Sequence, residues 1–488
     1  MNKFYITCAI PYVNAAPHIG HALEFIQGDV LARYHRLLGQ ETLLLSGGDE
    51  NALKNVQAAE KAGMPIQQFI DENNTKFFEL TKLLECQFDV WQKGSDIEHH
   101  FKSSQKLWEL CDKNGDIYSK SYEGLYCVGC EAFYTKEELN IDGECFEHPG
   151  KKLETVQEKN YFFNLKKYQH RLLDILKGKD KEYSLNIVPE KRKNEVISFL
   201  ESGLEDISIS RSNERAKNWG VPVPNDDTQR MYVWFDALNI YQSGVGFGWD
   251  EAMYKKWWPA DTHVIGKGIT RFHAVYWPAF LLSAGLPLPK SIFVHEYFTV
   301  NGQKMSKTLG NVIDPVALIE KYGADPLRYY FLAKFSPFND GDFSEEEFKK
   351  IYNADLANGL GNLTSRVAKL AEGFIFPPEA GITFFSDVVT DEKKRPTHYA
   401  KAFEQGRFDD ALKIIWNEVK IVDQYINDKQ PWTLKGEEKQ STLQVAIEAI
   451  RNISIKLQPF MPKTAEIIIE QFKGPSINLG DALFPRLT

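Results

Sequence analysis

Strand-like and helix-like runs of hydrophobic residues alternate in the N-terminal part of the chain. Residues 4–10 form a β-prone run, and a second apolar run at 42–45 precedes two glycines and an aspartate. Each run is followed by apolar residues at helical spacing, over 23–37 and 51–62. Because strands that alternate with helices assemble into parallel sheets, this order predicts an α/β fold with a doubly wound, Rossmann-type parallel sheet.

This pattern is interrupted between about 117 and 213 by a segment that contains clustered cysteines, several aromatic residues and a lysine-rich patch. Strand-like runs resume at 231–235, 262–265 and 291–300. We therefore expect one sheet assembled from two separated parts of the chain, with an inserted domain between them.

Strand signals almost vanish after about residue 353, where helical stripes replace them. Apolar residues recur at helical spacing in two series, which are Leu356, Leu360, Leu363, Val367 and Leu370, and then Ala411, Ile414, Ile415, Val419, Val422 and Ile426. A separate α-helical domain is predicted. The expected division is the first half of the sheet domain at 1–116, the insertion at 117–213, the second half of the sheet domain at 214–295, a connecting region at 296–350 and the helical domain at 351–488.

Composition narrows the class of protein but not its ligand. The 488 residues are 43% hydrophobic and 26% charged, which is typical of folded domains and unlike a disordered chain. A net charge of −9 argues against a surface that is basic throughout, although it leaves room for a local RNA-binding groove. No apolar run is long enough to span a bilayer, so we expect a cytoplasmic protein without membrane contact.

Three of the six cysteines crowd into the insertion. Cys127 and Cys130 are followed, after 14 intervening residues, by Cys145 and His148. Three thiolates and one imidazole at this spacing form a closed tetrahedral Zn²⁺ set, so we expect one structural zinc knuckle per chain. The alternative, buried free cysteines, is disfavoured because the loop around them is too polar to fold unaided.

The segment Pro17-His18-Ile19-Gly20-His21 lies where the first predicted strand leads into the first helix. A helix N-terminus offers free N–H groups to phosphate, a glycine permits close approach, and two imidazoles can donate to phosphoryl oxygens. Alone, the two histidines are as compatible with ordinary polar residues at a helix start.

A second candidate phosphate loop lies at 300–311, where Lys304 and Lys307 flank Met305 and Ser306. Lysines neutralise phosphates as point charges, and Gly302 and Gly310 permit a mobile loop. A lysine pair on a loop is otherwise usually just solvated.

Together, PHIGH and KMSKT resemble the two signature motifs of class I aminoacyl-tRNA synthetases, in the family's order. The resemblance implies a Rossmann catalytic domain whose two loops grip ATP with its Mg²⁺ while an amino-acid carboxylate attacks the α-phosphorus. It further implies that ATP is held by Pro17, His18, Gly20, His21, Lys304, Met305, Ser306 and Lys307, and that His18, Gly20, His21, Lys304 and Lys307 act in catalysis.

Within class I, the segments 9–14, 232–238 and 271–278 are similar to those of the methionyl-tRNA synthetase family. This resemblance implies methionine activation and transfer to tRNA(Met), and a methionine pocket formed by Ile10, Tyr12, Asp49, Trp234, Ala237, Leu238, Tyr241, Ile269, Phe272 and His273. Asp49 would receive the ammonium group, and aromatic faces suit a polarisable thioether. Without the resemblance, the aromatic residues would be interpreted as ordinary core.

Two positions depart from the family pattern. Asn51 stands where the family often has histidine, and Gly268 stands where it often has aspartate. The insertion is also too small for the separate editing domain that isoleucyl, leucyl and valyl enzymes carry, which disfavours those specificities.

In the helical domain, Asn362, Arg366 and Trp432 are similar to the anticodon readers of the methionyl family. Amide and guanidinium groups pair with base edges, and an indole stacks on an unstacked base. We expect initiator and elongator tRNA(Met) as partners and a monomeric enzyme. Two rivals remain: a nucleotidyltransferase that makes a small-molecule adenylate without RNA, and a non-catalytic, synthetase-like RNA-binding protein.

Overall fold

The computed structural model describes residues 3–127, 132–134, 138–146, 150, 153–300, 302–305, 310–377 and 397–487. The chain forms two compact units. The first comprises Met1–Pro17, Thr42–Thr81 and Gln87–His295, and the second comprises His18–Glu41, Lys82–Cys86 and Glu296–Thr488. None of the described helices is long and apolar enough to cross a membrane.

A six-stranded sheet forms the centre of the first unit, with the order β3-β2-β1-β12-β13-β7. Its strands are β1 (Lys3–Cys8), β2 (Glu41–Gly48), β3 (Val90–Lys93), β7 (Asn186–Val188), β12 (Thr262–Gly266) and β13 (Ser291–His295). β1 pairs in parallel with β12, so that Ile6 lies opposite Thr262. The prediction of one sheet from separated parts of the chain is therefore confirmed, but β7 comes from within the segment predicted as the insertion and pairs with β13.

Helices of the first unit carry most of the remaining core. They include α2 (Leu53–Ala62), α3 (Ile66–Leu83), α4 (Lys102–Lys113), α7 (Val233–Ala237), α8 (Ile240–Ser243), α9 (Glu251–Trp257) and α10 (Trp277–Ala284), with π-helical turns at Ile97–Phe101 and Phe272–Tyr276. The strand predicted at 231–235 is wrong: β11 (Asp226–Met231) ends there and α7 begins. A short apolar run that is buried on all sides fits either a strand or a helical turn, so its pattern alone does not decide between them.

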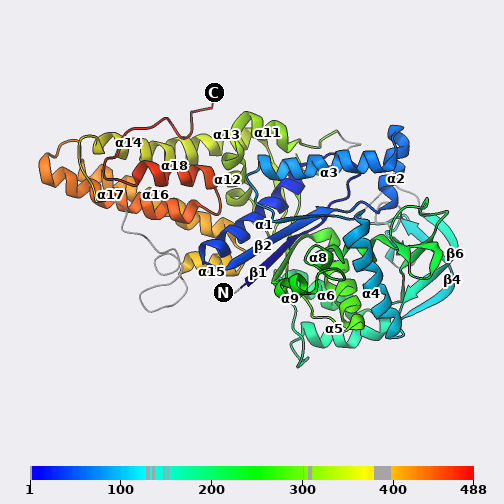
Figure 1. Ribbon diagram of the computed structural model, residues 1–488. Coiled ribbons are helices and arrows are strands. Elements are labelled where there is room, and N and C mark those ends of the chain that lie inside the picture. The colour runs from blue at the N-terminus through cyan, green and yellow to red at the C-terminus, as the bar shows by residue number, and fades with distance from the viewer. Residues whose placement is uncertain are drawn as a thin grey trace. The chain divides into compact units, whose positions relative to one another are not determined.

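A second, antiparallel sheet lies within the segment predicted as an insertion. β4 (Ile117–Cys127) pairs with β6 (Glu154–Phe163) from Ile117 opposite Phe163 to Tyr126 opposite Glu154. β5 (Ala132–Tyr134) and β8 (Ile207–Ser208) complete this sheet, and β9 (Ser210–Ser212), β10 (Pro222–Val223) and β11 form a smaller one. Helices α5 (Gln169–Leu176) and α6 (Glu190–Glu201) follow β6 (Figure 1).

The second unit is mainly helical, and it includes the predicted helical region together with α1 (Ile19–Leu37), which was expected in the sheet domain. Besides α1 it contains α11 (Pro315–Tyr322), α12 (Ala324–Lys334), α13 (Glu345–Ile351), α14 (Asn362–Ala371), α15 (His398–Glu404), α16 (Phe408–Lys429), α17 (Gly436–Leu457) and α18 (Pro462–Phe472), a π-helical segment at Tyr352–Gly361, and the short strands β14 (Phe298–Val300), β15 (Gln303–Lys304) and β16 (Gly341–Phe343). The run predicted as one strand at 291–300 is divided between β13 and β14. Both predicted stripes turn mostly inward: Leu356, Leu363, Ile415 and Ile426 are buried.

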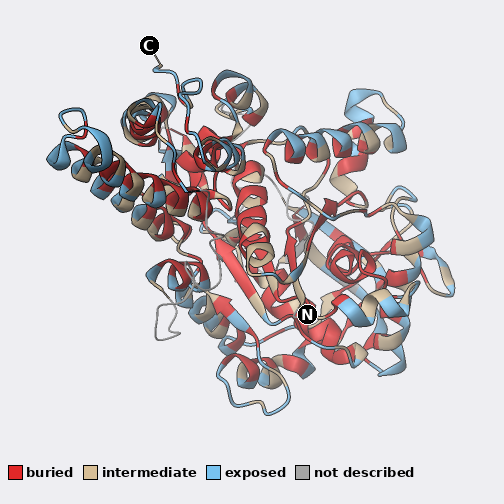
Figure 2. Ribbon diagram, turned by 60° about the vertical axis from the view of Figure 1, so that its left-hand side comes forward, coloured by how far each residue is buried: buried red, intermediate tan, exposed pale blue. Residues whose placement is uncertain are grey.

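Figure 2 shows that buried and exposed residues alternate at each turn of the helices, so that one side of each helix is buried.

A buried arginine fixes α1 within the second unit. Arg328 of α12 donates to Asp29 Oδ2 of α1 (2.7 Å), and also to the backbone oxygens of Leu84, Pro459 and Phe460 at 3.1, 2.8 and 2.7 Å. Arg328 and Asp29 are both fully buried.

Candidate active site

The first turn of α1 is organised by two histidines. His18 is the N-cap in extended conformation, and its Nδ1 accepts a hydrogen bond from the Gly20 backbone N–H at 3.0 Å. His21 Nδ1 in turn accepts from the His18 backbone N–H at 3.1 Å, and the two rings stack with centroids 3.9 Å apart. Because each Nδ1 is an acceptor, each neutral ring carries its proton on Nε2. Both histidines are thereby hydrogen-bond donors at a helix N-terminus.

Electrostatics keep His21 neutral. Burial, together with the neighbouring His18 ring, holds the pKa of His21 well below its usual range. His21 therefore offers an anion a neutral N–H donor beside the partial positive charge of the helix N-terminus.

Position 20 requires a glycine because the His18 ring lies against it. A Cβ at this position would lie 2.9 Å from His18 Cε1, so any side chain would displace the capping ring. That Cβ position is also 3.8 Å from Met305 Cε, which brings part of the second predicted phosphate loop to the start of α1. The backbone of Lys304 pairs with Thr299 in β14, whereas Ser306 and Lys307 and the side chain of Lys304 lie outside the described residues.

An aromatic cluster in the first unit brings together most of the predicted methionine pocket. Trp234 stacks on Phe272 with centroids 3.8 Å apart and an interplanar angle of 2°, and Tyr12 meets Trp234 edge-on at 6.2 Å. Ala237 and Leu238 are buried beside them, while Ile10 and Ile269 are half-buried and pack against the same core. These residues follow the carboxyl ends of β1 and β12 or lie on α7, where open α/β sheets bind ligands.

Tyr241 and His273 form a buried polar pair beside the aromatic cluster. His273 Nδ1 lies 2.9 Å from the Ile269 carbonyl oxygen, which fixes the proton on Nδ1. The bare Nε2 therefore accepts from the Tyr241 hydroxyl at 2.7 Å. Burial lowers the pKa of His273 to about 4, so this ring is neutral at pH 7.

Asp49 lies at the carboxyl end of β2, opposite Tyr12. The backbone N–H of Asp49 donates to the Pro11 oxygen at 2.9 Å, and Asp49 is only 3% exposed. Lys54, in the first turn of α2, places its Nζ 2.9 Å from the centroid of the Tyr12 ring. Sequence reasoning missed Lys54, and its only signal is a cation five residues after Asp49.

The departure at Asn51 has a structural partner. Asn51 Nδ2 donates to the Gly94 oxygen at 2.8 Å and to Asp236 Oδ2 at 2.6 Å. Burial raises the pKa of Asp236, and His100 Nε2 lies 3.7 Å from the same oxygen. Asn51 therefore ties the end of β2 to α7, the helix that carries Trp234. The second departure, Gly268, lies in a 3₁₀ turn at Lys267–Ile269.

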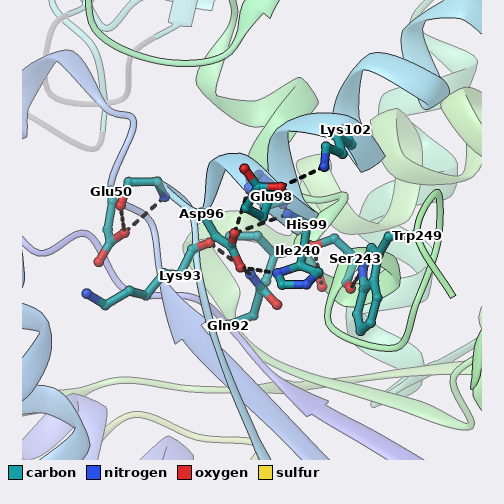
Figure 3. Close-up of polar contacts among 12 residues, drawn as sticks. Glu50, Gln92, Lys93, Asp96, Glu98, His99, Lys102, Ile240, Ser243 and Trp249 are labelled. Atoms are coloured by element: carbon teal, nitrogen blue, oxygen red, sulfur yellow. Dashed lines mark hydrogen bonds and ion pairs between the residues drawn. The ribbon is translucent and has the colours of Figure 1, made fainter.

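A polar network extends from this edge of the sheet (Figure 3). Glu50 accepts from the backbone N–H and the hydroxyl of Ser95 at 2.9 and 2.6 Å, and burial raises the pKa of Glu50. One residue on, Asp96 Oδ2 lies 2.9 Å from His99 Nδ1, whose ring meets Trp249 at 4.5 Å. The network fixes the loop after β3, and the sequence analysis does not predict it.

The structure describes two of the four predicted zinc ligands, Cys127 and Cys145. Cys127 at the end of β4 and Cys145 are 3% and 1% exposed. Cys130 and His148 lie outside the described residues. Within the described ranges, no group of three or more histidine, cysteine or acidic side chains is placed to hold a metal.

The three predicted anticodon residues lie on the helical unit. Asn362 and Arg366 are on α14, and Arg366 Nη1 donates to Asn427 Oδ1 of α16 at 3.0 Å while Nη2 lies 3.3 Å from Asp423 Oδ1. Trp432 is 51% exposed in the turn between α16 and α17. Asn427 was not among the predicted residues.

Two family models match the chain. The model of class I tRNA synthetases (M) matches residues 4–152 and 147–368, and that of the anticodon-binding domain of tRNA ligase matches residues 396–486. The methionine–tRNA ligase of Brucella melitensis is 40% identical over 97% of this chain and 92% of its own length. That of Thermotoga maritima is 41% identical over 96% of this chain and 75% of its own.

Solved structures agree with these matches. A structure of Mycobacterium tuberculosis methionyl-tRNA synthetase in complex with methionyl-adenylate has a TM-score of 0.90 and 36% sequence identity, with 100% of both chains covered. The free form of that enzyme has a TM-score of 0.83 at 33% identity, covering 100% of this chain and 99% of its own.

Proposed function

The chain belongs to the methionine–tRNA ligases of the class I aminoacyl-tRNA synthetase family, and we propose that His18 and His21 are the residues with which it stabilises the reacting phosphoryl group. The enzyme activates L-methionine with ATP and charges tRNA. In activation, a methionine carboxylate oxygen bonds to the α-phosphorus, the bond from that phosphorus to the bridging oxygen breaks, and pyrophosphate leaves. A ribose hydroxyl at the 3′ end of tRNA(Met) then bonds to the methionyl carbonyl carbon, the bond from that carbon to the phosphate oxygen breaks, and AMP leaves with the hydroxyl proton released.

The paired histidine cap is the observation that carries the proposed mechanism. Each Nδ1 accepts from a backbone N–H, which leaves two Nε2–H donors beside a helix N-terminus, and charge grows on the phosphoryl oxygens in the transition state. Lys304 and Lys307 add positive charge for the departing pyrophosphate, with Met305, Ser306, Pro17 and Gly20 completing the ATP site. Mg²⁺ that accompanies ATP neutralises its phosphates. No protein nucleophile is needed, because alignment and charge stabilisation suffice.

We further propose that the aromatic cluster is the methionine pocket. Trp234 and Phe272 present flat, polarisable surfaces to the thioether, and the Tyr241 hydroxyl is oriented by its hydrogen bond to His273 Nε2. Asp49 receives the ammonium group. The pocket is completed by Ile10, Tyr12, Ala237, Leu238 and Ile269.

A structural Zn²⁺ in the insertion is part of the same proposal. Cys127 and Cys145 are buried in a segment that is otherwise polar, and thiolates with one imidazole are the ligands that zinc prefers. When bound, the ion would cross-link the insertion through Cys127, Cys130, Cys145 and His148. Elemental analysis of freshly purified protein should find one zinc per chain, and Cys130→Ser should lose it. Metal-free protein with a folded insertion would contradict the proposal.

The anticodon-binding match supports tRNA as the second substrate and disfavours a small-molecule adenylating enzyme. We propose that Asn362, Arg366 and Trp432 read the anticodon of initiator and elongator tRNA(Met). The five-part division at 1–116, 117–213, 214–295, 296–350 and 351–488, the monomeric state and the cytoplasmic location stay predictions.

Methionine-dependent ATP–pyrophosphate exchange, measured without and then with tRNA, tests the whole assignment. Exchange without tRNA and charging of tRNA(Met) are expected, with leucine, isoleucine and valine inactive at equal concentration. Exchange supported equally by another amino acid would overturn the assignment of the pocket.

A further inference from the structure

A buried polar pair joins the two central strands of the large sheet next to the proposed methionine pocket, and neither residue belongs to the predicted site. Thr7 of β1 lies opposite His263 of β12 in the parallel pairing, and Thr7 Oγ1 lies 2.6 Å from His263 Nδ1. Both residues are fully buried. Their hydrogen bond links the strands that lead into the pocket, β1 toward Ile10 and β12 toward Ile269.

His263 packs against Tyr241, a residue of the proposed pocket. The two ring centroids are 4.5 Å apart, with an interplanar angle of 32°. The Tyr241 hydroxyl is bonded to His273 Nε2 at 2.7 Å, and the Tyr5 hydroxyl donates to the Tyr241 backbone oxygen at 2.6 Å. Tyr241 is thus held at its backbone, at its ring and at its hydroxyl.

The contacts to Tyr241 come from one face of the sheet. Tyr5 and Thr7 are two residues apart on β1, so their side chains point to the same face, and His263 shares that face as the pairing partner of Thr7. Thr262, one residue before His263, points to the opposite face, where its Oγ1 lies 2.8 Å from Ser291 Oγ. The sheet therefore has two similar hydroxyl contacts, of which one supports Tyr241.

The contact between Thr7 and His263 is a hydrogen bond between neutral groups. Burial, and then the neighbouring His273 ring, hold the pKa of His263 well below its usual range. Loss of one neutral hydrogen bond has a modest effect, so removal of the Thr7 hydroxyl should leave the fold intact while releasing the His263 ring.

The position of the Tyr241 ring matters most for a ligand that contains sulfur. A thioether gains from an aromatic ring when the sulfur lies about 5 Å from it, often at its edge. A methylene group in the same place makes only general apolar contact. A displaced ring therefore weakens binding of methionine more than binding of norleucine, in which a methylene replaces the sulfur.

We propose that Thr7 and His263 are positioning residues for thioether selectivity: the bonded pair fixes the Tyr241 ring and so sets the preference for methionine over norleucine. Both residues act through Tyr241. The inference rests on the proposed function, because it assumes that Tyr241 lines the methionine pocket.

Three threonine variants test this inference. Thr7→Val removes the hydroxyl and keeps the shape of the side chain, whereas Thr7→Ser keeps the hydroxyl. Thr262→Val is the matched control, because it makes the same chemical change on the same pair of strands but on the opposite face. Amino-acid-dependent ATP–pyrophosphate exchange gives kcat and KM for methionine, norleucine and ATP.

Thr7→Val is expected to raise KM for methionine about 2- to 10-fold and to leave KM for ATP unchanged. The ratio of kcat/KM for methionine to that for norleucine should fall about 2- to 10-fold, the range of one sulfur–aromatic contact. Thr7→Ser should restore both values, and Thr262→Val should match the unmodified enzyme.

His263→Phe tests the other half of the pair. Its ring can still pack on Tyr241 but cannot bond to Thr7, so Thr7→Val should have no further effect on the preference in this background. Additive losses would show that the two residues act separately and would overturn the pairing. Circular dichroism checks the fold, and the Thr7 variants decide the question if His263→Phe does not fold.

Three results with the threonine variants would overturn the inference: an unchanged preference in Thr7→Val, equal rises of KM for methionine and ATP, or a Thr7→Ser variant as impaired as Thr7→Val. Tyr241→Leu reports the pocket assignment separately. If Tyr241→Leu leaves KM for methionine and the preference unchanged, the assignment of the pocket is wrong. If Tyr241→Leu alters them and Thr7→Val does not, only the positioning role is wrong.

Discussion

His18 and His21 each use Nδ1 as an acceptor for a backbone N–H, and this tautomer leaves the Nε2–H of each ring as a hydrogen-bond donor. His273 makes the opposite choice: its Nδ1 meets a carbonyl oxygen, and its Nε2 accepts from Tyr241. The first two rings are therefore donors toward phosphate, while the third is an acceptor that orients a hydroxyl. Local backbone contacts, rather than the residue type, separate these roles.

We predict that His21→Ala raises the activation barrier for adenylate formation by about 2–4 kcal/mol, the usual effect of losing one donor to a developing oxyanion. His21→Asn is the matched variant, because its side-chain oxygen can still accept from the His18 N–H at the cap whereas it lacks the Nε2 donor. Single-turnover kinetics should show both variants equally slow. If the asparagine variant were fast, the histidine would serve only as a helix cap.

A second residue-scale prediction concerns His273 and pH. Its folded-state pKa of about 4 lies below the ordinary 6.5, so the unfolded chain binds a proton that the folded chain refuses. His273 therefore does not affect the free energy of unfolding above pH 6.5. As the pH drops toward 4, proton binding by the unfolded chain lowers the free energy of unfolding, by about 3 kcal/mol in the limit. Urea unfolding at pH 7 and pH 5 should show a smaller loss for His273→Gln than for the unmodified protein. An unchanged difference would mean that the ring is not buried neutral.

At the scale of residues, the sequence predicts contacts between neighbouring positions better than contacts between positions that are far apart in the chain. Trp234 and Phe272 were assigned to a pocket through family resemblance, because a buried aromatic looks the same in a core and in a binding site. The link from Asn51 to Asp236 joins residues 185 positions apart, and no local pattern indicates it. The contact of Lys54 with the Tyr12 ring has no local pattern for a similar reason, since the two residues are far apart in the sequence.

At the scale of elements, α1 is held in place by Arg328, a contact that the hydrophobic pattern of the sequence does not indicate. Its hydrophobic stripe predicts the helix correctly, but Arg328, a residue type expected at the surface, holds Asp29 inside the second unit. Conversely, no element was predicted over 66–83, where α3 forms. The π-helical turns at Ile97–Phe101 and Phe272–Tyr276 also lack a signal, because their extra residue per turn follows from tertiary packing.

We predict that Arg328→Ala lowers the free energy of unfolding by about 3–5 kcal/mol, because it removes one partner of a buried ion pair and leaves three backbone oxygens without their donor. Arg366→Ala is the control in the same unit: its side chain is 28% exposed, and its pair with Asp423 should be worth less than about 1 kcal/mol. Urea unfolding followed by circular dichroism measures both. Similar losses would show that Arg328 is not a special anchor.

At the scale of the molecule, the helical unit contains both the proposed phosphate-binding turn and the proposed anticodon residues. Phe403 of α15 stacks on Tyr34 of α1 at 4.0 Å and also meets Phe408, the first residue of α16. From there α16 runs for 22 residues, or about 33 Å, before the turn that carries Trp432 (Figure 1). The turn that carries Trp432 thus lies one helix length from the contact between α15 and the C-terminal part of α1.

From this separation we predict that Trp432→Ala weakens productive binding of tRNA(Met) about 10- to 150-fold, because stacking on one base is worth about 1–3 kcal/mol. Removal of a side chain that is 51% exposed should change stability little. Ile421→Ala, which removes an apolar side chain that is 58% exposed on α16, the helix before this turn, is the control and should alter neither pyrophosphate exchange nor aminoacylation.

The decisive comparison is between the two half-reactions of the Trp432 variant. Methionine-dependent pyrophosphate exchange involves only ATP and methionine, so it should match the unmodified enzyme, whereas kcat/KM for aminoacylation should fall with the tRNA affinity. A tRNA(Met) with an altered anticodon should be charged poorly by the unmodified enzyme and no worse by the variant, since the lost contact is the same. If exchange and aminoacylation fell together, Trp432 would be holding the turn between α16 and α17 in place, and the assignment of this end of the helices to the anticodon would be wrong.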